Sequence, residues 1–213
     1  MSLIASRGGG SVPPLEPGTY QAVCCGVIDL GRQYSEKFDK TAPKVLIMWD
    51  IVGETVEIDG VPAPRRLFKQ YTNSLDERST LAKDINSWRG QPFSPDELKA
   101  FDLRRLLNVG CQLSVVHEQR PDGRAFVNIA AVIGLPKGMQ IPPMSEAICY
   151  DADDHDAAVF ARLPEWVQDR IKQSEQWKAS GAGGAIQREA LPFDEPPEID
   201  TIGGSFGNGE LPF

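Results

Sequence analysis

The chain has 213 residues, 41% of them hydrophobic, and carries a net charge of −8 at pH 7. This length suits one globular domain of ordinary size with appendages, and no apolar run reaches the roughly 18 residues of a membrane span. The opening sequence lacks the apolar centre of a signal peptide, so we expect residues 1–14 to be a flexible N-terminus of a cytoplasmic protein.

The negative charge is concentrated near the C-terminus. Residues 14–143 contain sixteen Lys and Arg and sixteen Asp and Glu, whereas residues 144–186 carry −4 and residues 187–213 carry −5. A strongly acidic protein is a poor partner for nucleic acid. Because the longest of these segments is neutral, it could still carry a locally basic face.

Three β-rich segments come first, at 18–31, 43–60 and 65–74. The second has a long apolar run around Trp49, which we expect in the core, and the third alternates its side chains. Alternation and runs of β-branched or aromatic residues are typical of strands. The sequence therefore predicts three strands, the third with one basic and aromatic edge.

The pattern then changes to helical spacing. Apolar side chains recur at roughly helical intervals across residues 75–88, and Gly90 is expected to end that helix. In the FSPDELKAF that follows, Ser94 and Glu97 fit a capping box with Pro95 at the first helical position. This pattern predicts a second helix that starts at Ser94.

Two further strands, at 110–119 and 124–134, flank the tight-turn sequence Pro121-Asp122-Gly123 and are expected to form a hairpin. Three strands, a helical insertion and a two-stranded hairpin follow the order of the OB-fold, a five-stranded Greek-key barrel. We therefore predict a mostly β protein with an OB-fold over residues 15–143. Other small barrels and α+β folds share this order.

Residues 144–180 are expected to form a linker and a C-terminal helix. Pro164 opens that helix, and one face would pack on the barrel or on a second subunit through Trp166, Val167, Ile171 and Trp177. Residues 181–185 are glycine-rich, and the sequence beyond them is rich in Pro, Gly and acids. We predict that residues 181–213 form a disordered acidic tail.

The cysteines, histidines and glycines form no motif that carries catalytic chemistry. The four cysteines show no C-x-x-C spacing and are expected to be reduced, and His117 is expected to be structural. The acidic run at 151–156 lacks the glycine and distal Glu of a calcium loop and is interpreted as a solvated linker. Nucleophile-elbow, phosphate-loop and zinc-protease motifs are absent from the sequence. We predict no cofactor, no metal site and no enzymatic activity.

Cations and aromatic rings gather at residues 31–44, at 65–71 and in the last hairpin. Single-stranded nucleic acid is bound by cations that follow phosphates and by rings that stack on bases, each stack contributing on the order of 1–3 kcal/mol. Tyr34 and Phe38 lie in a polar loop between strands, where OB-folds often bind ligands. For each residue the alternative is a core ring or a solvated cation. The predicted DNA-binding residues are Arg32, Tyr34, Lys37, Phe38, Lys40, Lys44, Arg65, Arg66, Phe68, Lys69, Tyr71, Arg124 and Phe126.

Leu-Pro-Phe occurs twice in the tail, at 191–193 and at 211–213. A terminal Phe presents a ring, an α-carboxylate and nearby acids together, which suits a pocket with an apolar floor and a basic rim. Pro212 lowers the cost of ordering this segment. The alternative is an ordinary disordered tail. We expect a protein partner to bind Glu210, Leu211, Pro212 and Phe213.

This layout resembles that of bacterial and phage single-stranded DNA-binding proteins, in which an OB-fold is followed by a flexible linker and an acidic tail ending in Phe. The segments KVLIMWDI, LLNVGCQLSVVHEQRPDGRAFVNIAAVIGLPKG and LPEWVQDRIKQSEQWK are similar to segments of phage proteins of this kind. The tail departs from the bacterial pattern because Glu210 is its only acid next to the terminal Leu-Pro-Phe.

The resemblance implies a protein of phage or prophage DNA replication or recombination. It would bind single-stranded DNA without strong sequence preference and with strong salt dependence, and its tail would recruit replication or recombination proteins. The tail would also compete with DNA as an anionic mimic, and homo-oligomers would bind one strand more tightly than single domains. Two other classes stay open: an OB-like protein-interaction module without DNA binding, and a nuclease-like accessory protein that uses clustered carboxylates.

Overall fold

The computed structural model describes residues 14–36, 39–58, 60–119 and 125–180. In chain order, its strands and helices are β1 (Gly18–Ser35), β2 (Lys40–Ile58), β3 (Val61–Thr72), α1 (Thr80–Arg89), the 3-10 helix η2 (Leu103–Leu106), β4 (Gly110–Gln119), β5 (Ala125–Ile133), β6 (Ile148–Tyr150), α2 (Ala157–Arg162), α3 (Glu165–Lys172) and α4 (Glu175–Ala179). The predicted mostly β class, the three early strands and the late pair of strands are confirmed.

The strands form an antiparallel sheet in the order β3-β2-β1-β4-β5, and β6 pairs in parallel with β1. The predicted helix between the third and fourth strands is present as α1. Among the described residues, the end strands β3 and β5 approach each other but share no ladder hydrogen bonds. The sheet is therefore open.

β1 is the central strand of the sheet, and different parts of it pair with β2, β4 and β6. Residues 18–23 pair with β4, residues 26–28 pair with β6, and most of the strand pairs with β2. The ladder to β2 shifts register between Cys24 and Gly26 and again between Asp29 and Gly31. Such bulges bend a strand and increase its twist. Gly31 has a φ of +70°, a conformation that glycine adopts without steric cost.

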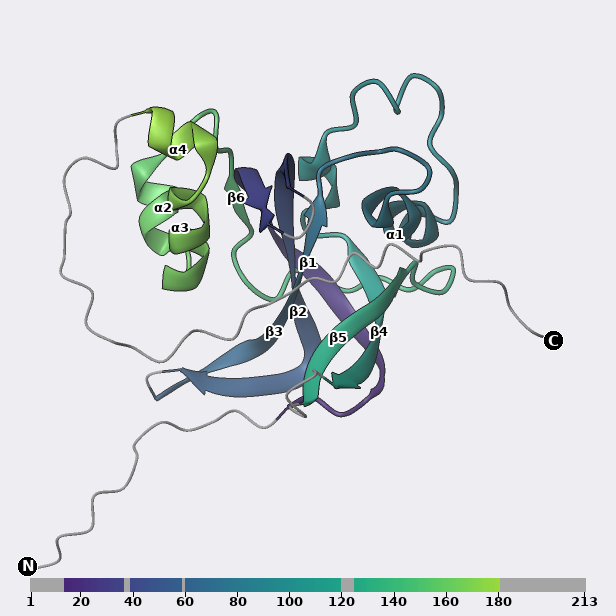
Figure 1. Ribbon diagram of the computed structural model, residues 1–213. Coiled ribbons are helices and arrows are strands. Elements are labelled where there is room, and N and C mark those ends of the chain that lie inside the picture. Colours follow the sequence, from purple (N-terminus) through teal and green to yellow (C-terminus); the bar gives the residue numbers. More distant parts are fainter. Residues whose placement is uncertain (1–13, 37–38, 59, 120–124, 181–213) are drawn as a thin grey trace, which may run out of the picture.

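The two faces of the β1–β2 pair bury separate apolar clusters, as alternation along a strand requires. One cluster packs Trp49, Leu113 and neighbouring strand residues against Ile85 and Trp88 of α1. The other packs Ile28, Leu46 and Met48 of the strands against α2–α4. Figure 1 shows α1 on one side of the sheet and α2–α4 on the other. We call residues 157–180 the helical cap.

The first helix ends as predicted, whereas the helix expected at Ser94 does not form. α1 starts after Ser79, whose side chain accepts a hydrogen bond from Ala82 N–H, and ends at Gly90 in the left-handed conformation. At Ser94 the capping box does form, since the Ser94 and Glu97 side chains each accept from the other's backbone N–H. The chain then continues as turns. A single turn with an exposed Leu98 buries too little to offset the cost of helix nucleation.

The helix predicted to open at Pro164 is split into α3 and α4. Ser174, which is buried, caps α4 by accepting a hydrogen bond from Trp177 N–H. An additional helix, α2, begins after Asp156, whose side chain accepts from two backbone N–H groups. Of the two packing alternatives for this region, the structure shows packing on the sheet, because Trp166 lies against Phe68 with ring centroids 4.7 Å apart.

Several smaller expectations are settled by the described residues. His117 is tied to the backbone, with its Nε2 atom 2.7 Å from the Leu15 carbonyl oxygen, which fits a structural role. The four cysteines are free thiols. None of the described helices is long and apolar enough to span a membrane. The predicted tail, the Pro121-Asp122-Gly123 turn and residues 1–13 lie outside the described residues.

Candidate functional site

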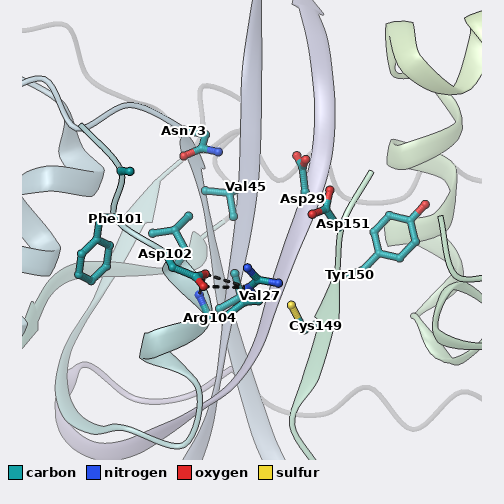
Figure 2. Close-up of a pocket in the computed structure, with 12 residues that line it drawn as sticks. Val27, Asp29, Val45, Asn73, Phe101, Asp102, Arg104, Cys149, Tyr150 and Asp151 are labelled. Carbon is teal, nitrogen blue, oxygen red and sulfur yellow. Dashed lines mark hydrogen bonds and ion pairs between the residues drawn. The ribbon is translucent and has the colours of Figure 1, made fainter. Parts of the chain in front are cut away.

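A groove of about 350 Å³ lies over β1 and β2, between residues 100–104 on one side and β6 on the other. Val27 and Val45 lie at its base, and Asn73 stands at one end. Figure 2 shows Asp29 and Asp151 side by side on one wall, facing the Asp102–Arg104 pair across the groove. The groove therefore combines an apolar base with polar walls that carry mostly carboxylates.

Asp29 is held in place by the bulge of β1. Its Oδ1 accepts a hydrogen bond of 2.8 Å from Gly31 N–H, and the backbone of Ala152 also hydrogen-bonds to the carboxylate. Burial raises the pKa of Asp29, and the nearby charges of Asp151 and Asp153 raise it further. A carboxylate offers about four lone-pair positions. Asp29 can therefore accept from a further donor in the groove.

The opposite wall is an ion pair at the start of η2. Asp102 caps this short helix, and its Oδ1 accepts hydrogen bonds of 2.9 Å from both the backbone N–H and the Nε–H of Arg104. These contacts hold the pKa of Asp102 below its ordinary value. The Arg104 side chain is 68% exposed. Asp102 thus largely offsets the positive charge of Arg104. The other carboxylates therefore leave the groove acidic.

The aromatic residues of the groove are engaged elsewhere. The Phe101 ring packs edge-on against Phe93, and the guanidiniums of Arg89 and Arg105 lie over it. The Tyr150 hydroxyl is 2.8 Å from Nδ1 of His155. Neither ring is free to stack on a ligand.

The groove walls carry one thiol and three carboxylates. Burial raises the pKa of the Cys149 thiol, which keeps it protonated and weakly nucleophilic at neutral pH. Across the described ranges, no group of His, Cys, Asp and Glu side chains is placed to hold a metal ion. The carboxylates are positioned to accept hydrogen bonds from a ligand that carries N–H donors or positive charge.

The hairpin of β1 and β2 extends from this groove and carries the strongest of the sequence-derived candidates. Tyr34 pairs with Thr41 across the hairpin, and Thr41 lies on the same face of β2 as Val45 at the groove base. Four residues separate these two positions, about 13 Å along a strand. Tyr34 is 59% exposed, and its hydroxyl donates to Asp39. An exposed ring thus stands on the groove face.

Three predicted cations accompany Tyr34 on this hairpin. Arg32 forms an exposed ion pair of 3.1 Å with Glu175 of α4, and Lys40 is exposed. Lys44 is half-buried, donates to Thr72 Oγ1 at 2.9 Å, and has a pKa lowered by burial. Two more predicted residues of this loop, Lys37 and Phe38, lie outside the described residues.

Two predicted DNA-binding residues of β3 are internal. Lys69 and Tyr71 are only 8% and 3% exposed, and both donate hydrogen bonds of 2.8 Å to Asp84 Oδ2 on α1. Because α1 covers this face of β3, a strand at the surface would not reach them. The basic and aromatic edge predicted from the alternation is therefore wrong at these positions.

The alternate residues of β3 contribute to the opposite side of the fold. Arg66 forms an ion pair of 3.0 Å with the fully buried Asp50 and donates to Ser145, which fastens the linker before β6 to the sheet. Phe68 packs on Trp166 of the helical cap. These two side chains thus have structural partners. Arg65 is half-buried on the same strand.

The remaining predicted residues are dispersed or outside the described residues. Phe126 is half-buried on β5, on the far side of β1 from β2 and β3. Arg124 and the C-terminal residues Glu210, Leu211, Pro212 and Phe213 lie outside the described residues. Arg32, Tyr34, Lys40 and Lys44 share the β1–β2 hairpin, with Arg32 and Tyr34 on one face and Lys40 and Lys44 on the other.

The sequence analysis missed the groove, although it noted the acidic run that contains Asp151 and interpreted it as a solvated linker. Asp29 is an acid within an apolar strand segment, just before Gly31. A partly buried carboxylate needs hydrogen-bond donors, and the β1 bulge supplies one, the backbone N–H of Gly31. Asn73, Asp102 and Asp151 come from separate loops, and only the fold brings them together. Comparison of the chain with protein-family models, with curated proteins and with solved structures gives no match.

Proposed function

We propose that this protein binds single-stranded DNA along the β1–β2 hairpin and the adjoining groove of an OB-type barrel, and that its C-terminal Leu-Pro-Phe binds a protein partner. The observation that carries the proposal is the exposed ring of Tyr34, with Arg32 two residues away on the same face of β1 and Lys40 and Lys44 elsewhere on the same hairpin. Exposed rings with neighbouring cations are the combination that single-stranded nucleic acid requires. A role in phage or prophage replication or recombination comes from the resemblance of the sequence.

The strand order supports an OB-type barrel. The path β3-β2-β1-β4-β5 has α1 between β3 and β4, and its end strands approach each other. The OB-fold is a partly open Greek-key barrel of five strands, and the loop between its first two strands is one of its usual ligand-binding loops. Tyr34 stands beside that loop.

The helical cap limits where a DNA strand could lie. Leu163, Val167 and Ile171 bury their side chains against β1 and β2. Displacing them would cost about 1.5–3 kcal/mol each, or on the order of 5–9 kcal/mol together. A stacked base contributes only about 1–3 kcal/mol of binding free energy. The cap therefore stays in place, and the uncovered groove face is the better path for DNA.

The test is fluorescence anisotropy of labelled oligo-dT at low and high salt. Tyr34→Ala is expected to weaken binding roughly tenfold, the equivalent of one lost stack. Val61→Ala, an equally exposed side chain on the β2–β3 hairpin, is the matched control and should have no effect. Affinity should fall steeply with salt because phosphate contacts release counterions.

A chain that ends at Ser180 tests the tail. Its removal takes away one Arg and six acids, so the net charge rises from −8 to −3. If the tail competes with DNA, the shorter chain binds oligo-dT more tightly. Weaker binding by the shorter chain would show that the tail does not compete. No binding by either chain at low salt would overturn the DNA proposal.

One observation favours the protein-interaction module as a second candidate. Three carboxylates but only one guanidinium line the groove, a charge balance that suits a Lys or Arg side chain of a protein partner. This candidate predicts that no oligonucleotide binds at any salt concentration.

A further inference from the structure

The first turn of α4 lies directly against β1 at Gly31. A Cβ added at Gly31 would come within 2.7 Å of Ser174 Cβ and 2.8 Å of Gln176 Oε1, so a side chain at this position would push α4 away from the strand. The Gln176 side chain also accepts a hydrogen bond of 2.7 Å from the backbone N–H of Arg32. The start of α4 is therefore held beside Arg32 by contacts with the β1 backbone.

This close approach places a carboxylate on a guanidinium that the proposed function assigns to DNA. Glu175 lies between the two α4 residues that contact Gly31, and its Oε2 accepts a hydrogen bond of 3.1 Å from Arg32 Nε–H. The side chains stay about half exposed, 51% for Arg32 and 54% for Glu175. Ion pairs exposed to this extent are weak, so a ligand can separate the two side chains while α4 stays folded.

A phosphate and Glu175 would compete for Arg32. Arg32 and Tyr34 lie on the same face of β1, so a base stacked on Tyr34 would bring its neighbouring phosphates toward this guanidinium. An arginine binds carboxylates and phosphates through the same fork of N–H donors. The two anions would also repel each other at this short range. Full contact of a phosphate with Arg32 thus requires Glu175 to turn away.

We propose that Glu175 is an intramolecular competitor of DNA, which pairs with Arg32 in the free protein and lowers the affinity of this contact for a strand. The inference rests on the proposed function, since it concerns the same hairpin. It is separate from competition by the C-terminal tail, because Glu175 belongs to the helical cap and remains in a chain that ends at Ser180.

The experiment measures the binding of labelled oligo-dT to the full chain by fluorescence anisotropy at low salt. Glu175→Gln removes the charge and keeps the shape of the side chain. We expect it to tighten binding about threefold, a change within the range that the loss of one exposed ion pair represents. The gain should shrink at high salt, because salt screens exposed charges.

Glu146→Gln is the matched control. It removes the same charge and releases Arg162, a guanidinium of similar exposure at 48%, from an ion pair of 2.6 Å between the linker before β6 and α2. Neither residue belongs to the β1–β2 hairpin. This variant should leave the affinity for oligo-dT close to that of the wild type.

A double-mutant comparison assigns the effect to Arg32. Arg32→Ala should weaken binding, and Glu175→Gln added to Arg32→Ala should give no further gain. If the thermal transition shows that Glu175→Gln does not fold, Glu175→Ala replaces it with the same expected gain.

Three results would overturn the competition and leave the proposed function standing. These are an unchanged affinity in Glu175→Gln, an equal gain in Glu146→Gln, and a gain that persists without Arg32. A wild-type chain that does not bind oligo-dT at low salt would overturn both proposals.

Discussion

At the scale of single residues, burial decides which predicted side chains are available to a ligand. Lys69 and Tyr71 satisfy their polar atoms on Asp84, whereas Tyr34 keeps an exposed ring. Removing one partner of a buried ion pair costs about 3–5 kcal/mol, since the other charge is left unpaired. Substitutions at Lys69 therefore report on stability, and Tyr34 is the better position for a test of binding.

Three buried thiols make stability sensitive to alkaline pH. Burial raises the pKa of Cys25 to about 12 and the pKa values of Cys24 and Cys111 further. In the unfolded chain these thiols lose their protons near their ordinary pKa of 9.0, whereas in the folded protein they keep them. The unfolded state then binds fewer protons, so stability falls as pH rises, by up to about 1.4 kcal/mol per pH unit for each thiol.

Urea unfolding between about pH 8 and about pH 11 measures this loss. Cys111→Ala should lower stability at neutral pH and make the alkaline decline shallower. Cys149, which is only partly buried and whose pKa burial raises less, serves as the comparison, and Cys149→Ala should make the decline shallower to a smaller extent than Cys111→Ala. An identical decline in wild type and Cys111→Ala would contradict a role for the buried thiol.

At the scale of elements, the helical cap belongs to the folded core. Ile171→Ala is expected to destabilise the protein by about 2–5 kcal/mol, because the cavity forms between α3 and the sheet. Lys172→Ala, at an exposed neighbouring position, should cost no more than about 1 kcal/mol. Urea unfolding followed by tryptophan fluorescence measures both. The cap would be a separate unit if α3 amides exchanged with solvent while those of β1 stayed protected.

Local sequence signals predicted elements far better than they predicted contacts between them. The alternation in β1–β3 and the Gly90 stop are properties of neighbouring residues, and the strands and the end of α1 were predicted from them. The capping box at Ser94 is equally local, but the residues after it, such as the exposed Leu98, bury too little apolar surface to stabilise a helix. The burial of Lys69 depends on Asp84, and the groove depends on loops far apart in sequence.

At the scale of the whole molecule, β1 organises both sides of the fold. It pairs with β2, β4 and β6, and its outward face receives the helical cap. The strands and α1 follow one another along the chain in the predicted order, whereas the position of the cap could not be derived from the local pattern of residues 164–177. That pattern showed an apolar face without showing what it would cover.

The early position of β1 and the late position of the cap have a consequence for the protein during synthesis. Ile28, Leu46 and Met48 leave the ribosome long before Leu163 and Ile171, which cover them. At a translation rate of about 5–20 residues per second, this apolar face stays exposed for on the order of ten seconds before the helical cap is synthesised. We expect ribosome-bound chains stalled before residue 157 to cross-link to a chaperone through this face, and chains stalled well beyond residue 180 to be released from it. Equal cross-linking of both would show that the nascent face is protected in another way.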